Sequence, residues 1–139
     1  MYYIGYALSE IMVKVAGKRI NFDDPEQCWN RLTKAIGPGG DDYPLWSAIR
    51  KRTETKFFSA YVDGCNIVVD CARSHTSSNI TKPRTINYGQ FSCVAHSYNR
   101  YIERTDYIRG TITKNCGENT SYIISLIHKI LSTDDEPTG

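Results

Sequence analysis

Apolar side chains recur at helical spacing in the last part of the chain, between Tyr122 and Leu131. This spacing predicts a helix with a broad buried face. The segment from Tyr107 to Thr113 is predicted to be a strand, and a polar loop joins it to the helix. The apolar positions that define the helix are Ile123, Ile124, Leu126, Ile127, Ile130 and Leu131.

Turn and cap signals divide the rest of the chain. Asp24 followed by Pro25 predicts a helix start, and Asp42 two residues before a proline predicts a second one. Asp63-Gly64 is the clearest hairpin signal. The predicted order is a hairpin over residues 2–22, helices over 24–36 and 42–49, a hairpin over 56–71, a short strand over 84–86, a helix over about 88–102, a strand over 107–113 and the final helix to residue 131.

These elements predict an α+β fold. Its sheet would be mostly antiparallel, made of two hairpins plus short strands, and three to four helices would pack on it. A chain of 139 residues can bury one substantial core, so residues 1–131 are predicted to form a single domain. Residues 132–139 are acidic and poor in apolar side chains, and we expect a flexible tail there.

Composition and charge argue against several classes of protein. The net charge of +2 gives no strong attraction to nucleic acid, so duplex DNA is not an expected partner. No apolar run approaches the roughly 20 residues of a membrane helix, and the N-terminus lacks a signal-like segment, so we expect a cytoplasmic protein. The five cysteines are odd in number, which argues against a disulfide framework. The histidines are scattered and no Cys-x-x-Cys pair occurs, so neither a metal nor another cofactor is implied.

Cys116 is the candidate nucleophile. If Asn115 caps the final helix and Glu118 returns the contact, Cys116 is the first helical residue, where the helix dipole favours a thiolate. His75 follows an apolar strand and is the best candidate base, and Asn87 could orient its imidazole. Such a trio suffices for acyl transfer. Each member also has an ordinary interpretation: a packed core residue, a polar loop residue and a turn former.

The same loop has a second interpretation as a binding site for a phosphate-bearing small molecule. Backbone donors and hydroxyl groups at a helix start bind anions, basic side chains neutralise their charge, and a tyrosine stacks on a base. Glu118 opposes an anion, and the chain has no Walker or dinucleotide glycine pattern. The residues of this predicted site are Asn115, Gly117, Asn119, Thr120, Arg109, Lys114 and Tyr107.

The segment from His75 to Leu131 resembles the circularly permuted papain-like hydrolases, the permuted NlpC-like group. The resemblance rests on a His-bearing segment, a following helix and Asn115-Cys116 before an apolar helix. It implies Cys116 as nucleophile, His75 as base and Asn87 as the orienting polar residue. The family acts on amide or thioester bonds.

Two functions are therefore predicted. The first is a cysteine-dependent amide or thioester hydrolase or acyltransferase of the permuted papain-like type, acting on a small-molecule or peptide ligand. The alternative is a non-catalytic binding module that captures a nucleotide-like small molecule or a protein partner, such as a viral or mobile-element protein that blocks host signalling or defence. Homo-oligomer formation stays open in both, and neither involves a membrane.

Overall fold

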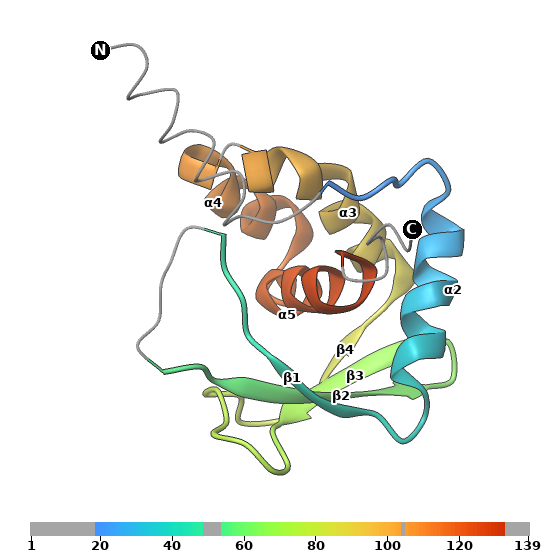
Figure 1. Ribbon diagram of the computed structural model, residues 1–139, viewed down its shortest axis with the longest axis vertical. Helices are drawn as coiled ribbons and strands as arrows, with labels where there is room; N and C mark the ends of the chain where they lie inside the picture. The colour runs from blue at the N-terminus through green and yellow to red at the C-terminus, as the bar shows by residue number, and fades with distance from the viewer. Residues whose placement is uncertain (1–18, 49–53, 104, 133–139) are drawn as a thin grey trace, which may run out of the picture.

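The computed structural model describes residues 19–48, 54–103 and 105–132, and these form a sheet with helices gathered on one of its faces (Figure 1). The predicted α+β class is confirmed. In chain order the elements are α2 (Pro25–Ile36), β1 (Asp41–Pro44), β2 (Phe57–Asp63), β3 (Asn66–Cys71), β4 (Arg84–Ile86), α3 (Tyr88–Glu103), α4 (Thr105–Cys116), α5 (Thr120–Leu126) and the π-helical segment η1 (Ile127–Ser132), which continues α5.

The sheet has the strand order β1-β2-β3-β4, and every neighbouring pair is antiparallel. The predicted hairpin around Asp63-Gly64 joins β2 and β3, and Asp63 pairs with Asn66. Gly64 has a φ of +67°, which a tight hairpin turn requires and glycine adopts freely. Local turn chemistry therefore sets the register of the two central strands.

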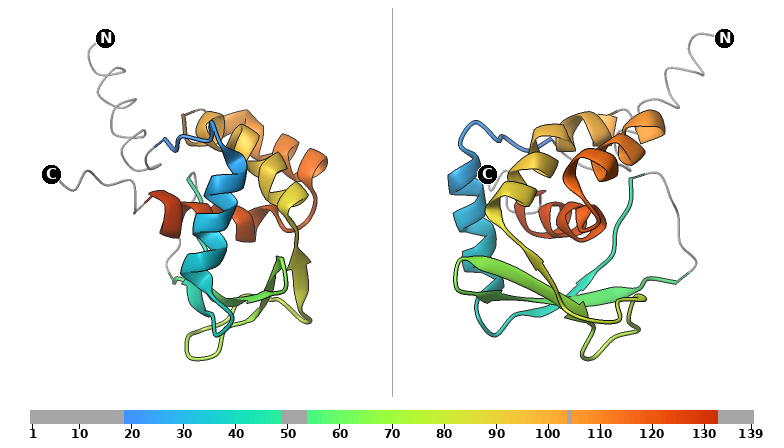
Figure 2. Two further views of the ribbon diagram at one scale, coloured as in Figure 1. Left: turned by 90° about the vertical axis from the view of Figure 1, so that its right-hand side faces the viewer. Right: turned by 180° about the vertical axis from the view of Figure 1, so that it is seen from behind.

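Side chains alternate between the two faces of the sheet, and one face is buried beneath the helices (Figure 2). On that face Phe58, Ala60 and Val69 are fully buried, and Ile67 pairs with Ile86 beside them. Helix α2 packs on β2, α5 packs on β1, and α3 packs against α4 and α5. The core thus lies between the sheet and a layer of helices.

Helix α2 forms as its sequence predicts. The Asp24 side chain accepts a hydrogen bond from the backbone N–H of Gln27, and Pro25 occupies the first turn. Trp29 and Leu32 lie on its buried face, and the helix ends before Gly37. The predicted helix over about 88–102 corresponds to α3.

Three predicted elements differ in the structure. The predicted helix over 42–49 is wrong, because residues 41–44 form β1 and Asp42 does not cap a helix. The predicted strand over 107–113 is wrong, because these residues lie in α4, where Ile108 and Ile112 are one turn apart on a buried face. The final helix begins at Thr120, not at Cys116. β-branched residues suggested a strand at 107–113, but burial of the isoleucine face favours the helix.

Two other predictions concern residues outside the described part of the chain. Residues 2–18 of the predicted N-terminal hairpin and residues 133–139 of the predicted tail lie there. Residues 19–22, which complete the predicted hairpin, lead into α2 without strand structure. Within the described ranges, no helix combines the length and the apolar character that crossing a membrane requires.

Candidate functional site

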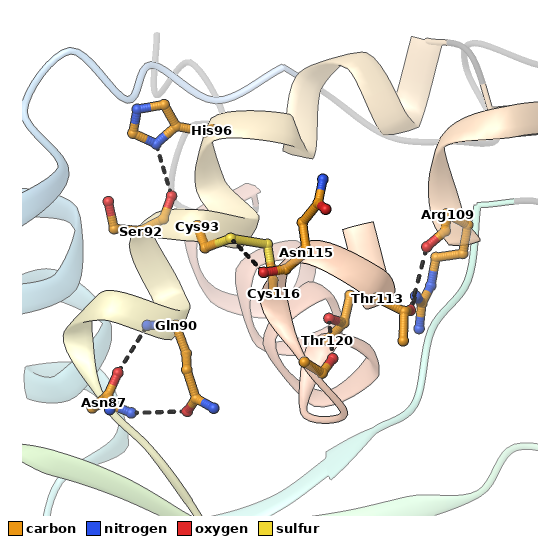
Figure 3. Close-up of a disulfide and its surroundings, with 11 residues drawn as sticks. Asn87, Gln90, Ser92, Cys93, His96, Arg109, Thr113, Asn115, Cys116 and Thr120 are labelled. Carbon is orange, nitrogen blue, oxygen red and sulfur yellow. Dashed lines mark hydrogen bonds between the residues drawn. A yellow bond between two sulfur atoms is a disulfide. The ribbon is translucent and has the colours of Figure 1, made fainter. Parts of the chain in front are cut away.

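Cys116 is bonded to Cys93 in a disulfide that links the end of α4 to the middle of α3 (Figure 3). Cys116 is the last residue of α4, one turn after Ile112 on the same buried face, and it is 8% exposed. Its predicted position at a helix start is therefore wrong, and in the disulfide it has no thiol to ionise. The pairing also corrects the expectation from the odd cysteine count, since two of the five cysteines form a disulfide and Cys28, Cys65 and Cys71 are not disulfide-bonded.

His75 and Asn87 have partners elsewhere. The Nδ1 of His75 lies 2.9 Å from the Oδ2 of Asp42, and the imidazole stacks on Phe57 with 4.1 Å between ring centroids. Asn87 caps α3: its Oδ1 accepts from the backbone N–H of Gln90, whose Oε1 accepts from the backbone N–H of Asn87. Figure 3 shows Asn87 and Gln90 at the start of α3, apart from the disulfide. The structure thus does not bring the three predicted catalytic residues together.

Asp42 holds the loop that follows β3. Its carboxylate is almost fully buried and accepts hydrogen bonds from the backbone N–H groups of Arg73 and Ser74 and from His75. Burial by itself would raise the pKa of Asp42, but these hydrogen bonds and the charge of His75 outweigh it and lower the pKa to about 2. Asp42 therefore stays ionised and orients His75.

Replacement of Asp42 by asparagine is expected to lower the free energy of unfolding by about 2 kcal/mol at neutral pH. The carboxyl pKa is lower in the folded than in the unfolded protein, so its contribution is complete above about pH 4 and is lost as pH falls towards 2. Urea unfolding of the wild type and of Asp42→Asn should therefore converge over this interval. The exposed Asp23→Asn is the control, and a wild-type advantage that persists unchanged at pH 2 would contradict the assignment.

The residues of the predicted binding loop do not come together in one site. Lys114 and Asn115 are exposed. Asn119 is buried and donates to the carbonyl oxygen of Thr85, and Thr120 is buried and donates through its hydroxyl to the carbonyl of Gly117. These side chains stabilise the turn between α4 and α5. The side chain of Tyr107, the aromatic member of the predicted site, lies outside the described part of the structure. Arg109 lies at the wall of a cleft.

Arg109 lines a cleft of about 530 Å³ between the segment after β1, the start of β4 and the α4–α5 region. This volume is within the range of small-molecule sites. Arginine, glutamate, hydroxyl, amide and aromatic side chains converge there. The lining residues are Leu45, Trp46, Ser47, Ser78, Asn79, Arg84, Arg109, Glu118, Ser121 and Tyr122.

The guanidinium of Arg109 is held by hydroxyl groups. One nitrogen donates to the Oγ of Ser121 at 2.6 Å, and another donates to the Oγ1 of Thr113. The side chain is half-buried, and this burial lowers the pKa of Arg109. Among the described residues these partners are neutral, so they orient the positive charge without compensating it.

Arg84 forms the second positive group of the cleft. Its guanidinium lies 6.0 Å from the centroid of the Tyr122 ring and 3.6 Å from the Oε1 of Glu118. Tyr122 follows Ser121 directly in α5, so the two guanidinium groups contact neighbouring residues of one helix. Glu118 contributes the only carboxylate among the described residues that line the cleft.

Aromatic side chains fix the wall opposite α4. The indole of Trp46 stacks on His128 with 3.7 Å between ring centroids, and its backbone N–H donates to the Oγ of Ser125 at 2.9 Å. The backbone N–H of Ala48 donates a hydrogen bond to the hydroxyl oxygen of Tyr101 at 2.8 Å. The segment after β1 is thereby held against the helices. Burial lowers the pKa of His128, which favours its neutral form behind Trp46.

Sequence reasoning identified Arg109 but missed Arg84, Trp46 and Tyr122. One signal for Arg84 was present. In the short predicted strand it lies two residues before Ile86, so the arginine is on the same face as a buried isoleucine. Trp46 was one of the apolar residues of the predicted helix over 42–49, and Tyr122 only marked the start of the final apolar segment, so neither carried a functional signal. Among the described residues, no group of three potential metal ligands occurs.

Comparison of the chain with protein-family models, curated proteins and solved structures found no match in any of the three.

Proposed function

We propose that the protein is a non-catalytic binding module that captures a small, nucleotide-like anion in the cleft of Arg84 and Arg109. The observation that carries the proposal is the half-buried guanidinium of Arg109, held by Ser121 and Thr113 at the wall of a cleft. A charge partly removed from water is costly unless another charge compensates it. An anionic ligand would supply that compensation.

The geometry of the arginines favours phosphate or carboxylate groups. A guanidinium presents its donors in a planar fork, which matches the oxygen atoms of such groups, and charge-assisted hydrogen bonds of this kind are stronger than neutral ones. Ser121 already takes one donor of Arg109 and fixes the direction of the fork. Thr113 takes a second donor, and the donors that neither hydroxyl group takes would bind a ligand in the cleft.

The aromatic side chains of the cleft favour a ligand that carries a ring. Trp46 and Tyr122 both line it, and aromatic surfaces with a few placed polar groups are typical of small-molecule sites. Asn79 adds an amide. A phosphate joined to a planar base would use both kinds of contact.

A cysteine-dependent hydrolase is the weaker proposal. It is supported by one contact, because a buried carboxylate on Nδ1 is the arrangement that orients a histidine base. It requires reduction of the Cys93–Cys116 disulfide and movement of the freed thiol to His75. The binding module requires neither.

The test is a panel of nucleoside monophosphates measured by thermal shift and calorimetry. A ligand that binds only the folded state raises the melting temperature. We expect Arg109→Gln to weaken binding at least about tenfold, since it removes charged hydrogen bonds, and Arg109→Lys to restore it only in part because the fork is lost. Exposed Arg100→Gln on α3 controls for net charge. Equal binding by wild type and Arg109→Gln would contradict this site.

A further inference from the structure

The mouth of the cleft contains an ion pair that already uses one of its two arginines. The Oε1 of Glu118 lies 3.6 Å from Arg84, and the Glu118 side chain is 87% exposed. An exposed pair of this kind contributes little stability, because water and salt screen it. Glu118 can therefore leave Arg84 at small cost to the fold.

Glu118 occupies Arg84 much as a carboxylate ligand would. It is a monoanion attached to the chain, in the turn between α4 and α5, so it competes at a fixed local concentration. A ligand with a single negative charge gains little by replacing it. A ligand with two charges gains more, since it would interact with Arg84 and with Arg109 together, and the hydrogen-bond partners of Arg109 in the described part of the chain are neutral.

We infer that the two arginines make the cleft selective for dianions, and that the ligand carries a phosphate monoester which displaces Glu118 from Arg84. A phosphate monoester carries a charge of about −1.5 to −2 at pH 7 and three acceptor oxygens, whereas a phosphate diester is a monoanion. Arg84 and Arg109 both line the cleft. One phosphate group between them would receive donors from both arginines. This inference rests on the proposed function and names the ligand class of the same cleft.

The charges around the cleft agree with this selectivity. Arg84 and Arg109 give two positive charges, and Glu118 gives one negative charge. Among the described residues that line the cleft, the charge of Arg109 is therefore in excess. Once Glu118 has moved away from Arg84, the two positive charges of the arginines match the two negative charges of a dianion.

The test compares adenosine monophosphate with its methyl ester, which has the same base and sugar but one charge fewer. Calorimetry is done well above the second phosphate pKa of about 6, so that the monoester is a dianion. Wild type should bind the monoester about tenfold more tightly than the methyl ester. In Glu118→Gln the monoester should gain about threefold because it no longer has to displace the carboxylate, and the methyl ester should gain less, so that the preference for the monoester grows.

Two further variants make the outcome specific. Glu26→Gln, an exposed residue of α2, should leave both affinities unchanged and controls for net charge. Arg84→Gln should abolish the preference for the monoester while Arg109 keeps residual binding. Equal wild-type affinities for the two ligands, or a monoester affinity that Glu118→Gln does not raise, would overturn the inference but keep the binding module. Absence of binding by both ligands in wild type and in Glu118→Gln would overturn the proposed function itself.

Discussion

Replacement of Gly40 by alanine is expected to lower the free energy of unfolding by at least about 3 kcal/mol. Gly40 precedes β1 and has a φ of +67°, which alone costs an alanine roughly 1 kcal/mol. The larger part of the effect comes from contact with β2. A Cβ at this position would overlap the carbonyl oxygen of Ala60 and lie 2.7 Å from the Cβ of Tyr61, so the backbone of one strand must move.

Gly37 and Gly64 are matched controls for this substitution. Their φ angles are +70° and +67°, but a Cβ at either position meets no atom within 4 Å. Alanine at Gly64 should therefore cost only about 1 kcal/mol, the backbone part of the effect. Alanine at Gly37 should cost roughly 1–3 kcal/mol, because its ψ of 171° lies in a region that only glycine adopts freely. Urea unfolding of the three variants measures the difference. If Gly40→Ala is no less stable than the controls, the close approach of residue 40 to β2 is incorrect.

Removal of the Cys93–Cys116 disulfide is expected to cost about 3 kcal/mol in the double variant Cys93→Ala, Cys116→Ala. The bond closes a loop with a sequence separation of 23, and without it the unfolded chain gains conformational freedom. Thermal unfolding of the wild type with and without a dithiol reductant should show the same loss. The double variant should not respond to the reductant.

Cysteine labelling supplies the control for this result. Alkylation of the unfolded, unreduced protein should modify Cys28, Cys65 and Cys71 and leave Cys93 and Cys116 unlabelled. Cys65→Ala changes an exposed cysteine and should leave the stability almost unchanged. If reductant does not alter the wild-type melting temperature, the disulfide does not stabilise the fold. Rapid labelling of Cys116 without reductant would return it to consideration as a nucleophile.

The elements that could be predicted from the sequence are those whose signals lie within a few residues. Helix α2 has its cap at Asp24 and its proline at residue 25, and the hairpin turn at Asp63-Gly64 fixes the pairing of β2 with β3. Helix α3 followed from the spacing of its apolar residues. Each signal acts through hydrogen bonds or turns that the segment makes with itself.

The same signals misled where a distant contact decides the outcome. Asp42 was interpreted as a helix start, yet its carboxylate binds the backbone at Arg73 and Ser74, more than 30 positions away in the chain. Residues 107–113 have strand-forming side chains, yet packing of Ile112 and the bond from Cys116 to Cys93 accompany a helix. Tertiary burial outweighs propensities of less than about 1 kcal/mol per residue.

By itself the sequence determined the α+β class, helix α2, the central hairpin and helix α3, and it named Arg109 as a candidate binding residue. Only the tertiary structure decided that Cys116 pairs with Cys93, that His75 pairs with Asp42 and that Arg84 joins Arg109 in one cleft. The physical reason is the range of the interactions. Caps and turns act between near neighbours, whereas a disulfide, a buried ion pair and a cleft depend on how distant segments pack together.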